Sequence, residues 1–297
     1  GAGPAGLEAA MSLGQRGYEV ALADSGDGGG RVVLESGLPG LASYKRVSDY
    51  RLGQIAKLAN VSFFPGSEMD RASVLEFGAD QVLVATGARW RADGLGRATH
   101  APIPGIADHP QCFTPDDIMT GQLPSTDSVL VYDDDHYYMG GVIAQLLADS
   151  GKTVTLVTPG PEVSCWTQNT MEQHRIEKAL LDRDVTLIAK HTLTGVAPDS
   201  ASFACNTTDR VLSVEAPGLV MVTLRAPQNG LYFALAGEAQ EQLDELPFGL
   251  LRIGDCMAPA TIAAAVYDGH RAAREMDNLP DPDGVPFKRE QSIIDPP

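Results

Sequence analysis

The sequence predicts an α/β protein with two domains, each built on a parallel sheet, the second domain inserted into the first. Short apolar runs typical of strands alternate with stretches of helical spacing along most of the 297 residues. A strand–turn–helix unit begins near residue 1 and again near residue 129, and its pattern returns near residue 253. We expect a first domain over 1–100 and 226–297, a crossover linker over 101–123, and a second domain over 124–225.

The first domain opens with a turn, a helix and a strand. The segment GAGPAGLEAAMSLGQRG contains small residues that let a helix lie close to a sheet, and Gly17 ends that helix. The next strand is YEVALAD. SYKRVSDYRLGQIAKLA has helical spacing, VSFFPG is a short strand, and ADQVLVATGARW is a buried strand followed by a turn. The strand that should precede Gly1 is missing from the sequence.

The second domain repeats the alternation. SVLVYDDD begins a strand–turn–helix unit, and GGVIAQLLADSGKTVTLVTPG supplies its helix and the next strand. A further helix and strand follow over NTMEQHRIEKALLDRDVTLIAKHTL, and FACNTTDRVLSVEAPGLVMVTLR reads as strands that cross back. The chain then returns to the first domain with a strand, a Gly-Asp turn and a helix, over GLLRIGDCMAPATIAAAVYDGHRAAREM. A Pro-rich tail follows.

Composition limits the partners. A net charge of −17 disfavours nucleic acid and anionic membrane surfaces, and the apolar runs are too short for a membrane span. The four cysteines are isolated, without the spacing of a redox pair, zinc site or iron–sulfur centre. These features predict a cytoplasmic protein. The first residue is not Met, so we expect the true N-terminus to lie upstream.

The segment from Gly1 to Gly6 is a GxGxxG loop. Gly1 permits a tight turn, Gly3 allows backbone to approach a pyrophosphate, and Gly6 lets the helix pack on the sheet. Asp24 follows at the end of the next strand, where an acid accepts hydrogen bonds from an adenosine ribose. A chance glycine-rich turn is the alternative, but helix, strand and acid together favour a Rossmann-like ADP or dinucleotide site.

Two further turns extend this site. Thr86 and Gly87 follow a strand and let the chain pass beside an adenine nucleotide, although an ordinary strand end has the same appearance. Asp255 lies between a strand and a helix, where it can bind near a ribityl group or pyrophosphate. Alone it would be interpreted as a helix cap, but the first loop favours the cofactor role.

These motifs resemble the two-dinucleotide-binding flavoproteins, which include glutathione and thioredoxin reductases. A closer resemblance, over nearly the whole chain, is to the C-terminal half of the trimethylamine, dimethylamine and histamine dehydrogenase family, with dienoyl-CoA reductase more distant. The segments that carry it are LESGLPGLASYKRVSDYRLGQI, ADQVLVATGARWRADG, PIPG, FTPDDIM, VLVYDDDHYYMGG and GHRAAREM with PFKRE.

The resemblance implies a glutathione-reductase-like arrangement with FAD or ADP bound in this chain. It extends the nucleotide role to Pro4 and Ala5 of the loop and to Gly30 and Arg31. Arg31 would pair with a phosphate, although a loop arginine that is simply exposed is the more common case. FMN and a four-iron–four-sulfur cluster are expected only in an N-terminal barrel domain or subunit that this sequence lacks. An electron-transfer flavoprotein is an implied partner, and we expect a homo-oligomer at full length. We assign no catalytic residue and no metal ligand here.

The second turn departs from a dinucleotide loop. Glycines would be expected at Asp133, Asp135 and Tyr138, and Leu224 replaces another glycine at the end of this domain. Side chains there block backbone approach and carboxylates repel a pyrophosphate. The simplest interpretation is a helix-start cap with solvated charge. A metal site with His136 is disfavoured because consecutive side chains diverge.

Three hypotheses follow. The first is the adenine-nucleotide-binding part of an amine-dehydrogenase-like iron–sulfur flavoprotein, inactive as an isolated fragment. The second is a FAD-dependent NAD(P)H oxidoreductase of the dienoyl-CoA reductase type, which needs a working second loop. The third is a non-catalytic nucleotide-binding module. The lost glycines favour the first.

Overall fold

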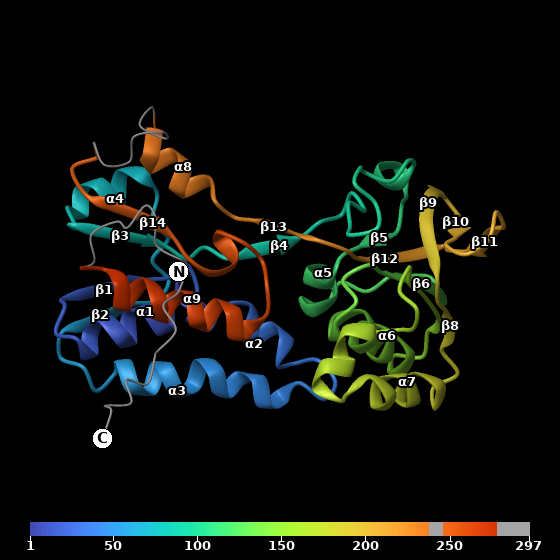
Figure 1. The fold of residues 1–297 in the computed structure, drawn as a ribbon, viewed down its shortest axis with the longest axis horizontal. Coiled ribbons are helices and arrows are strands. Elements are labelled where there is room, and N and C mark those ends of the chain that lie inside the picture. Colours follow the sequence, from blue (N-terminus) through green and yellow to red (C-terminus); the bar gives the residue numbers. More distant parts are fainter. Residues whose placement is uncertain (238–245, 278–297) are drawn as a thin grey trace, which may run out of the picture.

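The chain forms two lobes joined by extended segments (Figure 1). The computed structural model describes residues 1–237 and 246–277, so the predicted Pro-rich tail lies outside the described residues. The first lobe comprises the described helices and strands between residues 4 and 84 and between 230 and 275, and the second lobe those between residues 106 and 222. An antiparallel pair, β4 (Ala88–Trp90) with β13 (Arg225–Pro227), links the lobes. The predicted α/β class with Rossmann-like units is confirmed.

The first lobe follows the predicted order of helices and strands, with 3-10 helices marked η. Its elements are α1 (Pro4–Gln15), β1 (Val20–Ala23), α2 (Arg31–Glu35), η1 (Ala42–Lys45), α3 (Arg46–Ile55), β2 (Val61–Phe64), α4 (Arg71–Phe77), β3 (Gln81–Val84), α8 (Gly230–Ala236), β14 (Gly249–Arg252), η6 (Gly254–Cys256) and α9 (Ile262–Glu275). Its strands form two separate parallel pairs, β1 with β2 and β3 with β14.

Small residues bring α1 and α9 together. A Cβ at Gly269 would lie 2.1 Å from the Ala5 carbonyl oxygen, so only glycine fits at this contact. Helix α1 starts at Pro4, whose missing N–H costs nothing in the first turn. The close approach fixes the N-terminus of α1 beside the turn that follows β14.

The second lobe holds a continuous parallel sheet of order β5-β12-β6-β7-β8. Its elements are η2 (Ile106–Asp108), β5 (Cys112–Phe113), α5 (Pro115–Met119), β6 (Ser128–Asp133), α6 (Tyr138–Asp149), β7 (Thr153–Val157), η3 (Cys165–Thr170), α7 (Gln173–Leu181), β8 (Thr186–Ile188), β9 (His191–Ala197), β10 (Ser200–Cys205), β11 (Val211–Glu215) and β12 (Gly218–Val222).

Strand β6 is the centre of that sheet. Val129 and Val131 face the core formed with α6 and α7, whereas Leu130 and Tyr132 face the antiparallel sheet β9–β11 on the other side. A strand buried on both faces has a continuous apolar sequence rather than an alternating one, as VLVY does. The strands predicted to cross back therefore include an antiparallel layer that covers one face.

Residues 101–123 are more than a connection. They supply β5, at the edge of the five-stranded sheet, and Ile103 and Ile106, which are buried in the core on the β9–β11 side. The segment is thus structurally part of the second lobe. Across the described residues, no helix is both long and apolar enough to cross a membrane.

Candidate nucleotide-binding site

The loop from Gly1 to Gly6 passes between the carboxyl ends of β1 and β3. A Cβ at Gly1 would lie 2.4 Å from the Ala85 carbonyl oxygen, and a Cβ at Gly6 would lie 1.9 Å from the Gly1 carbonyl oxygen. The first and third glycines are therefore required by the packing of the protein itself. At Gly3 the nearest atom to a Cβ is 4.0 Å away, so this backbone has space beside it. That distribution matches a loop that leaves its middle glycine for a ligand.

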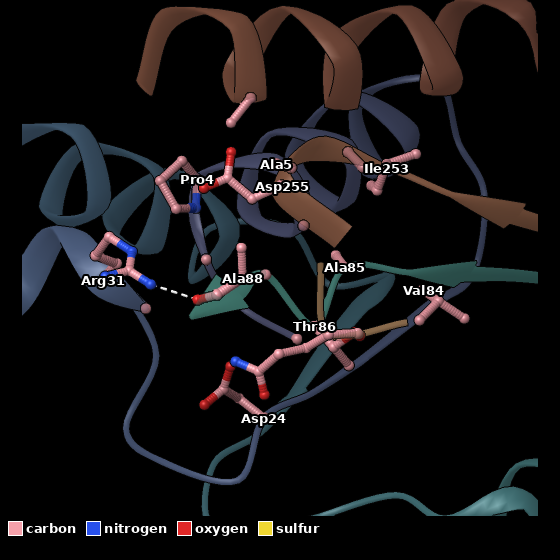
Figure 2. Close-up of a pocket in the computed structure, with 18 of the residues that line it drawn as sticks. Pro4, Ala5, Asp24, Arg31, Val84, Ala85, Thr86, Ala88, Ile253 and Asp255 are labelled. Atoms are coloured by element: carbon pink, nitrogen blue, oxygen red, sulfur yellow. Dashed lines mark hydrogen bonds between the residues drawn. The ribbon is translucent and has the colours of Figure 1, made fainter. Parts of the chain in front are cut away.

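Asp24 holds the loop from the end of β1. Its Oδ2 accepts a hydrogen bond of 2.6 Å from the Ala2 N–H, and its Oδ1 accepts one of 2.8 Å from the Gly26 N–H. Asp24 and Thr86 both line the cavity shown in Figure 2. Each carboxylate oxygen keeps a second lone pair, so Asp24 can still accept from a ribose hydroxyl.

A cavity of about 2090 Å³ opens above the loop. All the residues predicted for the site line it: Gly1, Gly3, Pro4, Ala5, Gly6, Asp24, Gly30, Arg31, Thr86, Gly87 and Asp255. The first turn of α1 carries no acidic residue. The free N–H groups of that turn and the helix dipole therefore face the cavity without a competing carboxylate on the same turn. This geometry suits a pyrophosphate.

Arg31 departs from the expected loop position. It is the first residue of α2, and its guanidinium donates to the Ala88 carbonyl and, at 2.5 Å, to Asp116 Oδ1. Gly30, just before it, has a φ of 57°, and a Cβ there would lie 2.9 Å from the Gly3 Cα. Arg31 lines the cavity while neutralised by Asp116, so its first role is to join the two lobes.

Thr86 and Gly87 lie where β3 leads into β4. The Thr86 hydroxyl donates to the Gln228 carbonyl and contacts the Cys256 thiol at 3.2 Å. Gly87 has a φ of 75°, which favours glycine, and a Cβ there would meet no atom within 4 Å. This turn is therefore shaped by the protein and leaves open space.

Asp255 belongs to η6 and is not the cap of the following helix. Thr261 takes that role, because its hydroxyl accepts from the Ala264 N–H at the start of α9. The Asp255 carboxylate instead forms a 2.5 Å ion pair with Arg225 and accepts from the Ala260 N–H at 3.0 Å. The capping alternative is wrong, and a charged pair faces the cavity.

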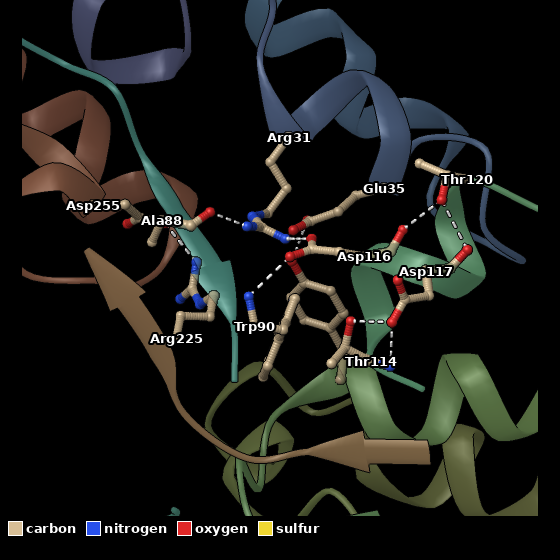
Figure 3. A network of polar contacts seen from close by, with 11 residues as sticks. Arg31, Glu35, Ala88, Trp90, Thr114, Asp116, Asp117, Thr120, Arg225 and Asp255 are labelled. Carbon is tan, nitrogen blue, oxygen red and sulfur yellow. Dashed lines mark hydrogen bonds and ion pairs between the residues drawn. The ribbon is translucent and has the colours of Figure 1, made fainter. Parts of the chain in front are cut away.

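A polar network beside the site was not predicted (Figure 3). The Tyr138 hydroxyl donates to Glu35 Oε2 at 2.6 Å, and Asp116 accepts from the Trp90 N–H at 2.8 Å as well as from Arg31. Glu35 is only 4% exposed, and this burial raises the pKa of its carboxyl. The partners are 26 to 103 residues apart in sequence, so no local spacing signals them.

The second turn is buried rather than solvated. Asp133 Oδ1 accepts from the N–H groups of Asp135 and His136, both at 3.1 Å. Its Oδ2 lies against Gly140 and has no hydrogen-bond partner among the described residues. Tyr137, not an aspartate, precedes the first residue of α6. The predicted cap with solvated charge is therefore wrong. Burial raises the pKa of Asp133 to about 7, with the Asp135 charge adding to it.

A loop of the chain covers this turn. The Ala98 N–H donates to the buried Asp134 carboxylate at 2.9 Å, and a Cβ at Gly96 would lie 2.0 Å from the same carboxylate. Arg97 approaches Asp135 to 3.6 Å and lies 4.4 Å from the Trp166 ring centroid. Protein atoms thus contact the carboxylates that a pyrophosphate would have to approach. No group of described residues has the arrangement of a metal site.

Comparison with known proteins identifies the family of the chain. The pyridine nucleotide-disulphide oxidoreductase family matches residues 1–245. The chain belongs to this family. Dimethylamine dehydrogenase of Hyphomicrobium sp. (strain x) is 29% identical over 98% of the chain and 43% of its own length. The resemblance to the amine dehydrogenases inferred from the motifs is confirmed.

Solved structures of this group are similar throughout. Histamine dehydrogenase from Rhizobium sp. 4-9 has a TM-score of 0.92 and 40% identity over 100% of the chain and 46% of its own. The 6-hydroxypseudooxynicotine amine oxidase from Pseudomonas geniculata N1 has a TM-score of 0.87 and 40% identity, over 92% of the chain and 40% of its own length. Thioredoxin reductase of T. acidophilum, 17% identical with a TM-score of 0.61, shares the fold alone. The chain spans less than half the length of its amine-oxidising relatives.

Proposed function

We propose that this chain is the adenine-nucleotide-binding part of an amine-dehydrogenase-like flavoprotein oxidoreductase, with ADP or FAD as its ligand. The contrast between the two turns carries the proposal. The Gly1–Gly6 loop offers an uncharged helix start, space at Gly3 and the Asp24 carboxylate. The second turn offers buried carboxylates covered by the chain.

Different residues of the first site would contact different parts of the nucleotide. Asp24 would accept from the ribose hydroxyls, the first turn of α1 would donate to the pyrophosphate, and Gly3 would let it come close. The Arg225–Asp255 pair also lines the cavity, with Asp255 beside Pro4 and Ala5 (Figure 2), and would orient groups beyond the pyrophosphate. A bound FAD would supply hydride and electron transfer, whereas ADP would be structural.

We further propose that the amine-oxidising chemistry lies outside these 297 residues. The relatives are more than twice as long, and FMN with a four-iron–four-sulfur cluster would belong to an N-terminal barrel domain or subunit. Electrons would pass to a carrier such as an electron-transfer flavoprotein. A cytoplasmic homo-oligomer remains part of the proposal.

The test is the nucleotide content of the purified chain. Protein is denatured, and released nucleotides are separated by chromatography after the absorption spectrum is recorded. Colourless protein that releases ADP supports the proposal, and yellow protein that releases FAD supports its flavin form. Protein that releases neither, and binds neither when they are added, contradicts it.

The alternative of a FAD-dependent NAD(P)H reductase rests on the family match alone. It needs pyridine nucleotide at the second turn, where Asp133 and Asp134 are buried and the Ala98 N–H contacts Asp134. Titration with NADH and NADPH separates the two functions, because saturable binding at the second lobe would favour the reductase.

A further inference from the structure

The segment that begins helix α2 is packed against the nucleotide loop. The Gly29 N–H donates to the Ala2 carbonyl at 2.7 Å, and a Cβ at Gly30 would lie 2.9 Å from the Gly3 Cα. The backbone of the two segments is therefore in direct contact, with no side chain between them. A shift of α2 would have to carry the Gly1–Gly6 loop with it or break this contact.

The same helix presents two side chains to the second lobe (Figure 3). Arg31 and Glu35 are one helical turn apart and therefore lie on the same side of α2. Arg31 forms a 2.5 Å ion pair with Asp116 of α5. The hydroxyl of Tyr138, the first residue of α6, donates to Glu35 Oε2 at 2.6 Å. The second lobe thus holds α2 at two points, from two different helices.

An apolar contact lies beside these polar ones. Leu38 and Leu41, which follow α2 in the chain, are buried in the same core cluster as Ile118 and Ile143 of the second lobe. This shared core keeps water from the interface, and Glu35 itself is buried. A hydrogen bond to a buried carboxyl group contributes more than one exposed to water.

Tyr138 has a particular place in this contact. It stands where the pattern of a dinucleotide loop predicts a glycine in the second lobe. A glycine has no side chain that could reach the first lobe, whereas the tyrosine hydroxyl reaches Glu35. The residue that departs from the loop pattern therefore also provides a contact between the lobes.

We propose that α2 couples the second lobe to the nucleotide loop. The second lobe holds α2 through Asp116 and Tyr138, and α2 holds the Gly1–Gly6 loop through Gly29 and Gly30. Tyr138 is then a positioning residue, which acts on the first site through α2. Coupling is reciprocal, so a nucleotide in the first lobe should also stabilise the start of α6. Only this last consequence rests on the proposed nucleotide-binding function.

The first test removes one hydroxyl and uses the full chain without nucleotide. Tyr138→Phe deletes the donor to Glu35 and keeps the ring. The matched control is Tyr267→Phe, at an exposed tyrosine of α9 whose hydroxyl has no hydrogen-bond partner among the described residues. Hydrogen–deuterium exchange is measured over residues 33–38, which belong to the first lobe, with β7 as an internal reference.

We expect residues 33–38 to exchange about tenfold faster in Y138F than in Y267F, corresponding to about 1.4 kcal/mol of local stability. In a chain that carries Glu35→Met, which lacks the acceptor, Tyr138→Phe should cause no further acceleration. Equal exchange in Y138F and Y267F, or a full further acceleration in the Glu35→Met chain, would overturn the proposal.

A second variant tests the other contact, and it decides the question if Y138F does not fold. Asp116→Asn weakens the ion pair with Arg31, and Asp209→Asn, at an exposed acid of the same lobe, is its control. We expect faster exchange over residues 33–38 in D116N alone. Equal exchange in D116N and D209N would contradict the coupling.

The reciprocal effect is measured with ADP as the probe. Saturating ADP should slow the exchange of residues 142–146 in α6 of the Y267F chain, and should slow it less in Y138F. ADP that binds without slowing these amides in either chain would overturn the coupling. If ADP does not bind, the nucleotide proposal fails, whereas the comparison without nucleotide still tests the role of α2.

Discussion

Both lobes contain a strand–turn–helix unit, but the surroundings of the turn differ between them. In the first lobe the turn is glycine-rich and lines a large cavity. In the second lobe the turn holds Asp133 and Asp134, both fully buried, under the loop that carries Arg97. The strands of the first lobe form two separate parallel pairs, whereas the second lobe has a continuous five-stranded sheet, and its turn buries Asp133 and Asp134 although Asp135 still lines the cavity. We therefore propose that the side chains of the turn, rather than the strand–turn–helix outline, determine whether a lobe binds a nucleotide.

The largest expected effect concerns Asp133. The folded chain keeps a proton on this carboxyl up to about pH 7, whereas an ordinary aspartate loses it near pH 3.8, so the folded state loses stability as pH rises between these values. Burial lowers the pKa of His136, but the hydrogen bond to Asp134 and the charges of Asp133 and Asp134 raise it by more. His136 therefore also makes the folded state less stable as pH rises. Between pH 5 and 8, the free energy of unfolding should therefore fall by about 3 kcal/mol less in the D133N variant than in wild type.

Urea unfolding at the two pH values measures this difference. Asp127→Asn, at an exposed acid just before β6, is the matched control and should behave as wild type. If D133N and wild type show the same pH dependence, the buried acid does not distinguish the lobes as we infer.

Gly6→Ala should have the next largest effect, on the first lobe. The new Cβ would lie 1.9 Å from the Gly1 carbonyl oxygen, so the loop and α1 must separate. ADP affinity should fall more than about a hundredfold, or about 2.7 kcal/mol. Calorimetric titration measures it. Gly53→Ala in α3, where a Cβ meets no atom within 4 Å, is the control and should bind normally. Unchanged affinity in G6A would argue against the loop as the site.

Asp24→Asn should weaken adenine-nucleotide binding by about tenfold, because a charged acceptor of ribose hydroxyls becomes a neutral one. The change should also loosen the Ala2 N–H contact at 2.6 Å. Titration with ADP measures the loss, with Asp27→Asn at a neighbouring exposed acid as the control. Equal affinities for D24N and D27N would remove the ribose role from Asp24.

Arg97→Ala should have the smallest effect. Arg97 is 40% exposed, and its contacts with Trp166 and Asp135 should contribute less than about 1 kcal/mol to stability. We expect no gain of NADH binding, because Asp133 and Asp134 remain. Arg210→Ala, at an exposed arginine of the same lobe, is the control. Saturable NADH binding by R97A alone would show that the loop, rather than the acids, closes the site.

Much of the first site was predictable because its signals are local. Gly1, Gly3, Gly6 and Asp24 lie in one continuous turn, helix and strand, and their spacing fixes where each must lie. The positions of Arg31 and Asp255 at the cavity were expected, but their partners were not. Asp116 and Arg225 come from segments 85 and 30 residues away, and only the packed lobes bring them together.

The sequence by itself determined the α/β class, the open first loop and the loss of glycines in the second, because backbone conformation and side-chain volume act within a few residues. Only the tertiary structure decided that Asp133 and Asp134 of the second turn are buried, that Thr261 rather than Asp255 caps α9, and that Arg31 pairs with Asp116 of the other lobe. Burial and strand pairing depend on which surfaces meet, and segments distant in the sequence supply those surfaces.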